Sequence, residues 1–436
     1  MSAIVNCLKS FLSNRIPPQL VIQFTNHCNA RCPQCGMRVH ARMARSTLSD
    51  SAMRRILDAA AARNVATLSF TGGEPLLFLD RLVAWMDYAG QVGIPFIRTG
   101  TNGFLLRRNG APGFEDRIKR LAERLAATPL RNFWISLDSA YPAVHEKMRG
   151  LAGVVAGIEK ALPIFHAAGL YPSANLGINR AVAGAAARHL KPGRYGDAES
   201  YLAAFYGCYR DAFDRFYRFV RTLGFSMVNA CYPMSIGEAD KAGGLSAVYA
   251  ATSAEDVVRF SAAEKAVLYK ALLETIPEHR AHLRIFSPLS SLYMLYRQYA
   301  HPERDQDSAG CRGGIDFFFI NAENGDTYPC GYRGDENLGQ FHRLDLRAMK
   351  RVPDCRRCDW ECFRDPSELC APVLQALHQP LALSRKLRRD SLYRTYWMSD
   401  LRYYGACDFF DGRKPLVARK MNKFAHPRFN KILSQV

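Results

Sequence analysis

The sequence lacks any long uninterrupted apolar run, any cleavable signal segment and any repeat of fixed period. No stretch of about 18 apolar residues occurs, so no membrane-spanning helix is predicted. Residues 1–11 contain Lys9 and no small-residue cleavage site, which argues against a secretory signal.

Acidic residues are scarce, with 40 Asp and Glu against 59 Lys and Arg, a net charge of +19. The composition is otherwise globular, since 48% of the 436 residues are hydrophobic and 23% are charged, which excludes a disordered chain. Cysteine is plentiful, with 13 residues. In a chain of this length without a signal segment, cysteines are read as metal ligands before disulfides.

Six short β-rich segments alternate with helical segments in the first half of the chain. Near-continuous apolar strands in such a succession predict a parallel sheet covered by helices, either a partial barrel or an open doubly wound sheet. In both, loops at the C-terminal ends of the strands carry the chemistry. The predicted strands are 20–25, 66–70, 96–101, 133–137, 173–178 and 225–230, and the predicted helices are 49–63, 79–92, 114–127, 154–168 and 198–223.

The pattern changes after Cys231. Residues 232–255 are rich in Gly, Ala and Ser and predict a loop, and residues 256–300 predict two or three helices broken at Pro277 and Pro288. The turn Asn324-Gly325-Asp326 predicts a hairpin of two short strands, 317–320 and 327–328. A short loop at 353–372 holds four cysteines.

The strongest local signal is a group of three cysteines, Cys28, Cys32 and Cys35, directly after the first predicted strand. We call this group the first cysteine loop. Three thiolates suit a soft metal. A closed zinc site would need a fourth ligand, for which His27 and His40 are candidates. A four-iron cluster would keep one iron open for an outside ligand.

The CxxxCxxC spacing after a first strand resembles the radical S-adenosylmethionine (SAM) superfamily. Four further motifs match in order, each at the end of a predicted strand or just after it: 71–75 (TGGEP), 101–103 (TNG), 136–138 (SLD) and 145–150 (HEKMRG). The resemblance covers about residues 19–235 and implies a partial (β/α)6 barrel. It also implies that the first cysteine loop binds a 4Fe–4S cluster and that SAM contacts Gly72, Gly73, Glu74, Asn102, Ser136, Asp138 and Arg149. Gln34 departs from the family, which often has an aromatic residue before the third cysteine.

Four more cysteines, which we call the second cysteine set, flank the predicted hairpin and form a CxxC pair: Cys311, Cys330, Cys355 and Cys358. Four thiolates suit either structural zinc or an iron–sulfur cluster. Behind a radical SAM core they resemble the SPASM/Twitch auxiliary domain, which implies one auxiliary 4Fe–4S cluster. Cys362 and Cys370 could serve a second cluster or be buried thiols, and Cys7, Cys208 and Cys231 are expected to be inert core residues.

Two surfaces are basic or aromatic. Helix 198–223 carries eight aromatic residues whose helical spacing indicates core packing or one wall of a substrate cavity. The stretch 381–436 has 13 Lys and Arg against 4 Asp and is expected to pack on the body of the protein through its aromatic residues. It could also meet an anionic membrane surface, nucleic acid or a phosphorylated substrate.

The resemblance implies five segments. Residues 1–18 lead into the radical SAM core at 19–235, and a helical linker at 236–305 follows. A small cysteine-rich α+β domain at 306–372 then carries the auxiliary cluster, and a basic tail spans 373–436.

The expected function is reductive cleavage of SAM to a 5′-deoxyadenosyl radical that abstracts a substrate hydrogen, with a net oxidation or bond formation on a small, possibly anionic, molecule. The chemistry implies a cytoplasmic enzyme and an electron donor such as flavodoxin or ferredoxin. Two alternatives stay open: a radical SAM maturase acting on a peptide or protein, and a basic zinc protein that binds nucleic acid.

Overall fold

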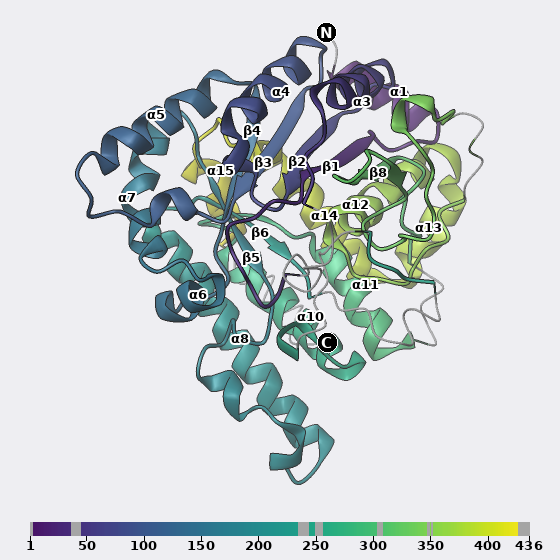
Figure 1. The fold of residues 1–436 in the computed structure, drawn as a ribbon. Helices are drawn as coiled ribbons and strands as arrows, with labels where there is room; N and C mark the ends of the chain where they lie inside the picture. The colour runs from purple at the N-terminus through teal and green to yellow at the C-terminus, as the bar shows by residue number, and fades with distance from the viewer. Residues whose placement is uncertain are drawn as a thin grey trace.

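The computed structural model describes residues 3–35, 45–233, 244–248, 256–302, 308–346, 349 and 352–425 (Figure 1). The strands are β1 (Gln19–Thr25), β2 (Thr67–Gly72), β3 (Phe96–Thr101), β4 (Leu130–Ser136), β5 (Ser173–Gly177), β6 (Met227–Cys231), β7 (Arg284–Phe286), β8 (Phe317–Ile320) and β9 (Thr327–Tyr328). The longer helices are α1 (Ala3–Leu12), α3 (Asp50–Ala62), α4 (Leu79–Gln91), α5 (Phe114–Ala127), α6 (Pro142–Arg149), α7 (Val154–Ala167), α8 (Ala198–Leu223), α10 (Ala262–His279), α11 (Leu289–Ala300), α12 (Glu361–His378), α13 (Pro380–Arg389) and α14 (Ser391–Ala406), and the short helix α15 (Ala418–Met421) follows them.

The strands form one open sheet in the order β7-β6-β5-β4-β3-β2-β1-β8-β9. Strands β1 to β7 are parallel to their neighbours, β8 is parallel to β1, and β9 is antiparallel to β8. All six strands predicted in the first half are present, with ends shifted by a few residues. The predicted α/β partial barrel is therefore confirmed.

The second half of the chain extends this sheet at both edges, which the sequence did not predict. β7 lies inside the segment expected to be wholly helical and pairs with β6. The hairpin of β8 and β9 forms as predicted, but β8 pairs with β1 and so adds to the barrel sheet. The register Gln19↔Phe317 joins residues almost 300 positions apart, and such a pairing leaves no local signal in either strand.

Two local expectations are wrong. Pro277 was expected to break a helix, but it lies within α10, whose last residue is His279. Proline removes one hydrogen bond from this last turn, and the helix ends two residues later. Cys362 and Cys370 were expected in a short loop with Cys355 and Cys358, but both lie on α12.

The two faces of the sheet differ in chemistry. Alternate residues of each strand point to opposite faces. One set, for example Ile22, Phe70 and Ile135, is fully buried in the main core against the helices. The other set on β3, β5 and β6 contains Arg98, Asn175 and Cys231, which are only partly buried. We call this second side the inner face.

The C-terminal helices pack on the body, as predicted for the basic stretch. Tyr393, Tyr396 and Tyr403 of α14 are 0–1% exposed, and the buried Asp400 accepts a 2.7 Å hydrogen bond from Arg280. Helix α8 extends below the sheet in Figure 1. Its Phe205 and Tyr209 stack at 4.4 Å within the core, which favours core packing over a cavity wall for these rings.

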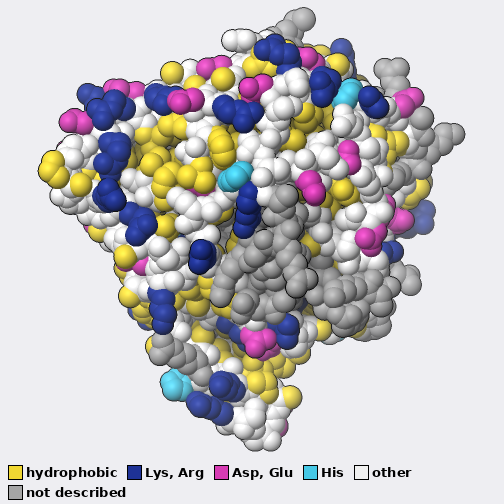
Figure 2. All heavy atoms as spheres, in the orientation of Figure 1, with side chains coloured by type: hydrophobic (Ala, Val, Ile, Leu, Met, Phe, Trp, Pro, Cys, Tyr) yellow, Lys and Arg dark blue, Asp and Glu magenta, His cyan; other side chains and the backbone are white. Residues whose placement is uncertain are grey.

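Basic side chains do not gather into one patch on the face seen in Figure 2, where Lys and Arg lie among acidic and hydrophobic groups. Within the described ranges, no single helix combines the length and hydropathy needed to cross a membrane. Only α6 and α7 together meet the criteria, and they are bent by 102° at their junction.

Candidate functional site

The first cysteine loop lies at the C-terminal edge of the sheet, directly after β1. The Cys32 side chain is buried, while Cys28 and Cys35 are half-buried. The amide of Cys35 donates to the carbonyl of Cys32 at 3.1 Å, which forms a tight turn between two of the three thiols. Burial raises the pKa of Cys28 and Cys32, and the positive charge of Arg149 acts in the opposite direction on both.

The spacing of the thiols bears on the metal. Among the described residues, no three cysteine sulfurs lie within 4.8 Å of one another. Tetrahedral zinc with Zn–S bonds of about 2.3 Å would bring its sulfurs to about 3.8 Å. The wider arrangement suits ligands that surround a larger cluster.

The glycines of the second motif are required by protein packing. A Cβ on Gly72 would lie 2.0 Å from the carbonyl oxygen of Thr25, and one on Gly73 would lie 2.0 Å from that of His27. The amide of Gly73 donates to Thr25 and that of Glu74 to His27, at 2.9 and 2.8 Å. These glycines therefore let the end of β2 press against the start of the first cysteine loop.

Glu74 joins the second motif to the third. Its carboxylate is fully buried and accepts hydrogen bonds from the amide of Asn102 (2.6 Å), the hydroxyl of Thr101 (2.8 Å) and the amide of Leu76 (3.0 Å). Burial raises the pKa of Glu74 to about 7 despite these donors. Because protein groups occupy the carboxylate, Glu74 holds the end of β3 in place.

Asn102 connects β3 to the first cysteine loop. Its side-chain amide donates to the Asn29 side chain at 2.9 Å and lies 3.9 Å from the sulfur of Cys28. The second motif, the third motif and the cysteine loop thus form one hydrogen-bonded unit.

The fourth and fifth motifs meet in a buried ion pair. Arg149 donates two parallel hydrogen bonds of 2.7 Å to Asp138, whose side chain is fully buried. Burial alone would raise the pKa of Asp138, but Arg149 and His145 hold it well below its usual range. Arg149 is therefore not a solvated helix charge. Among the residues that the structure describes, its Nη1 group makes no hydrogen bond, which leaves two N–H donors for a ligand.

Gln34 explains the departure from the family pattern. Its side-chain amide donates to Asp138 at 2.8 Å, so the residue before Cys35 attaches the first cysteine loop to β4. Ser136, the remaining predicted contact, is buried at the end of β4 opposite Asn175. The structure thus brings all the predicted SAM-site residues to one edge of the sheet.

The second cysteine set also comes together. The amide of Cys311 donates to the carbonyl of Cys355 at 2.8 Å, and the amide of Tyr332 lies 3.4 Å from the sulfur of Cys330. Burial first, and then the neighbouring thiols, raise the pKa of Cys311 to about 11 and that of Cys358 well above its usual value. Without a metal these thiols would stay protonated.

A buried cation accompanies the second cysteine set. Arg364 is 5% exposed, donates to the carbonyl of Cys358 at 3.1 Å, and has no partner in the structure for its Nε and Nη2 groups. An anionic metal–thiolate centre would compensate this charge, so the residues present fit such a group.

Cys362 and Cys370 do not belong together. They are eight residues apart on α12, about 12 Å along a helix. The Cys362 sulfur lies 3.4 Å from the Glu361 carboxylate and interacts electrostatically with Cys231. Cys370 instead interacts electrostatically with Cys7 and Arg312. This arrangement disfavours a second auxiliary cluster on this pair.

The inner face holds polar residues that the sequence reasoning did not select. Cys231 was expected to be an inert core thiol, but it is partly accessible beside Asn175 and close to Glu361. Burial raises the pKa of Glu361 to about 7. The signal that could have revealed this group is Arg98, a lone charge in an otherwise uncharged strand.

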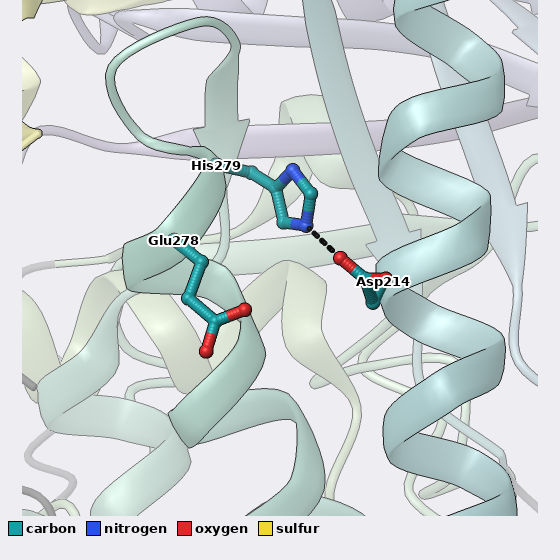
Figure 3. A group of neighbouring side chains, drawn as sticks. All are labelled: Asp214, Glu278 and His279. Carbon is teal, nitrogen blue, oxygen red and sulfur yellow. Dashed lines mark hydrogen bonds and ion pairs between the residues drawn. The ribbon is translucent and has the colours of Figure 1, made fainter.

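One other group could suggest a metal. Asp214, Glu278 and His279 place ligand atoms within 4.8 Å of one another (Figure 3). His279 is hydrogen-bonded to Asp214 at 3.0 Å, and arginines already neutralise both carboxylates, Arg218 on Asp214 and Arg210 on Glu278. This is an ion-pair network between α8 and α10.

Comparison with known proteins agrees with the site. The fold is an α/β partial barrel, and the first cysteine loop lies at the C-terminal ends of its strands. Residues 22–178 match the family described as Radical SAM superfamily. The chain contains a radical SAM domain and is an enzyme, and the cofactors of this family are a 4Fe–4S cluster and SAM.

Curated relatives match only part of the chain. A probable GTP 3′,8-cyclase of Thermococcus kodakarensis is 28% identical over 33% of this chain and 43% of its own length. The PqqA peptide cyclase of Rhodopseudomonas palustris is 28% identical over 32% of this chain and 33% of its own length. The chain thus spans less than half the length of these relatives.

Among solved structures, SuiB of Streptococcus suis bound to S-adenosylmethionine is 17% identical, with a TM-score of 0.49. The match covers 77% of this chain and 66% of SuiB.

Proposed function

We propose that this protein cleaves SAM reductively and uses the resulting radical to abstract a hydrogen atom from a small molecule, giving a net oxidation or a new bond. The observation that carries the proposal is the first cysteine loop itself. It lies inside the matched segment and is hydrogen-bonded to the other motifs through Asn102 and Gln34. When bound, the cluster and SAM supply the 5′-deoxyadenosyl radical.

The residues of this chain hold and orient that chemistry. Cys28, Cys32 and Cys35 are the cluster ligands, with Arg149 favouring their thiolate forms. The free Nη1 group of Arg149 binds the SAM carboxylate as a charge-assisted donor. Gly72 and Gly73 would supply backbone for the amino group of SAM, and Glu74 holds the backbone of Asn102 in position at the end of β3.

The second cysteine set holds one auxiliary 4Fe–4S cluster, supported by the buried charge of Arg364. When bound, this cluster supplies an electron acceptor or relay. Cys362 is the second residue of α12 and lies near Cys231 of the inner face, only four residues after Cys358. The substrate site therefore lies between the two cysteine groups. Residues 19–235 and 306–372 form the corresponding catalytic and auxiliary parts. An electron donor such as flavodoxin or ferredoxin and a cytoplasmic location complete the proposal.

A peptide substrate is the second candidate. One relative is named for a peptide and another for GTP, and the chain covers less than half of each. The enclosed inner face suits a small molecule or the side chain of a peptide.

The test is SAM cleavage. The protein would be reconstituted with iron and sulfide without oxygen, reduced with dithionite, and assayed for 5′-deoxyadenosine. Wild type and a Cys208→Ala control are expected to produce it, while Cys28→Ala, Cys32→Ala and Cys35→Ala are not. Any of these three variants that produces it at the wild-type rate would exclude the ligand assignment.

A further inference from the structure

The inner face contains accessible surface deep inside the protein. Trp134, Asn175, Cys231, Glu361 and Cys362 keep accessible surface, in contrast to the fully buried residues on the helix-covered face of the same strands. Three of them, Cys231, Glu361 and Cys362, are nonetheless so enclosed that desolvation is the largest influence on their pKa values. These residues form a partly accessible polar region beside the inner face.

Arg98 of β3 lies beside the same region and interacts electrostatically with Cys362, Cys231 and Glu361. The backbone of β3 pairs it with Ser69 on one side and Asn132 on the other, both uncharged. Its guanidinium carbon lies 5.6 Å from the centre of the Trp134 ring and 5.5 Å from that of Phe286. Both rings lie within cation–π distance of the guanidinium.

No counter-ion meets this charge. Among the described residues, Arg98 makes no hydrogen bond and no ion pair, and its nearby acid, Glu361, stays beyond ion-pair distance. Burial lowers the pKa of Arg98. Two other enclosed arginines have carboxylate partners: Arg149 has Asp138, and Arg280 has Asp400.

A partly enclosed cation without a carboxylate partner is costly, because it has lost part of its hydration and no opposite charge replaces it. Two aromatic rings recover only a small part of this cost. A residue kept at such a cost is typical of binding sites, where function opposes stability. The alternative, that Arg98 only supports the fold, predicts that removing its charge lowers stability.

We propose that Arg98 binds an oxyanion of the substrate, a phosphate or a carboxylate of a small molecule, on the inner face between Trp134 and the pair of thiols Cys231 and Cys362. This inference rests on the proposed function, since it places the substrate below the first cysteine loop. The planar guanidinium donates two parallel hydrogen bonds to the oxyanion. Asn175, hydrogen-bonded to Asn229 at 2.5 Å, offers further polar contacts beside it.

The test measures anion binding to the reconstituted, SAM-loaded protein. Thermal unfolding would be followed with inorganic phosphate, pyrophosphate or succinate as probes, at constant ionic strength adjusted with potassium chloride. The variants are Arg98→Gln, which removes the charge, and Arg98→Lys, which keeps the charge but loses the planar fork. Arg120→Gln, an exposed position on α5, removes the same charge elsewhere and is the matched control.

At least one probe is expected to raise the Tm of wild type and Arg120→Gln, because ligand binding to the native state stabilises it. Arg98→Gln should weaken the apparent affinity for that probe by about tenfold or more, and Arg98→Lys should fall between. Without probe, Arg98→Gln should unfold at the wild-type temperature or above it. A response to phosphate alone identifies a phosphate ester, and a response to succinate alone a carboxylate.

Three results would overturn the site: no probe raises the wild-type Tm, Arg98→Gln and wild type respond equally, or Arg98→Gln is destabilised without probe. Trp134 fluorescence, compared with a Trp134→Phe variant, gives a second readout of the same binding. Measuring 5′-deoxyadenosine in parallel separates the two proposals. Cleavage of SAM without anion binding rejects only the role of Arg98, whereas absence of cleavage in wild type rejects the proposed function.

Discussion

Replacing Arg149 with alanine should destabilise the protein before any cofactor is considered. The substitution removes two hydrogen bonds of 2.7 Å and leaves Asp138, which is 0% exposed, with Gln34 and the amide of Gly177 as hydrogen-bond donors and with His145 at 3.7 Å. Breaking a buried ion pair by removing one partner costs about 3–5 kcal/mol, mostly because the remaining charge is uncompensated. At about 2 °C per kcal/mol for a large chain, Tm should fall by roughly 6–10 °C.

Two further variants test the cause of this loss. Asp138→Asn combined with Arg149→Ala removes both charges and should recover a large part of the lost stability. Arg124→Ala, whose partner Asp80 is 89% exposed, should shift the free energy of unfolding by less than about 1 kcal/mol. Thermal unfolding of the cofactor-free protein measures all three. An Arg149→Ala protein as stable as wild type, or a double variant no better than the single one, would refute the reasoning.

The remaining predictions concern metal content, pH and SAM. A variant in which alanine replaces Cys28, Cys32 and Cys35 should keep about four irons per chain, since one complete set of thiolates remains. About eight irons would indicate two auxiliary clusters. One zinc without iron would indicate a structural zinc site. Cys362→Ala and Cys370→Ala should leave the iron content of the reconstituted protein unchanged, and a loss of about four irons in either variant would reassign that cysteine as a ligand. The pKa of Glu74 is raised in the folded state to about 7, so its stabilising contribution is fully present below about pH 4.5 and is lost as pH rises to about 7. Glu74→Gln should remove this loss of stability, which amounts to up to about 3 kcal/mol. If urea unfolding of wild type and Glu74→Gln depends on pH in the same way, the raised pKa of Glu74 is contradicted. Arg149→Lys, which keeps the charge, should weaken SAM binding by about 1.5–3 kcal/mol in equilibrium dialysis with unchanged iron content, and unaltered affinity would mean that Arg149 does not touch SAM.

The sequence predicted what local patterns encode. The strands of the first half and the hairpin around Gly325 are found. Hydrophobic periodicity and turn residues are local signals, so they are visible without the fold.

Long-range pairings were not visible. The addition of β8 to β1 and the different surroundings of Cys362 and Cys370 on α12 depend on contacts between distant segments. The role of Glu74 also changed. The motif suggested a ligand contact, whereas the structure shows its carboxylate bonded to the backbone of Asn102. A motif indicates which residues gather at a site, but it does not say which of them face the ligand.

The pairing of β8 with β1 has a consequence for electron flow. Cys311 precedes β8 and Cys330 follows its antiparallel partner β9, so both lie near the end where β1 begins, while Cys28 follows the end of β1. The seven residues of β1 span about 20 Å. The length of β1 therefore sets the separation between the first cysteine loop and this end of the second cysteine set. If both groups bind clusters as proposed, an electron passing between them would cross about this distance of protein interior.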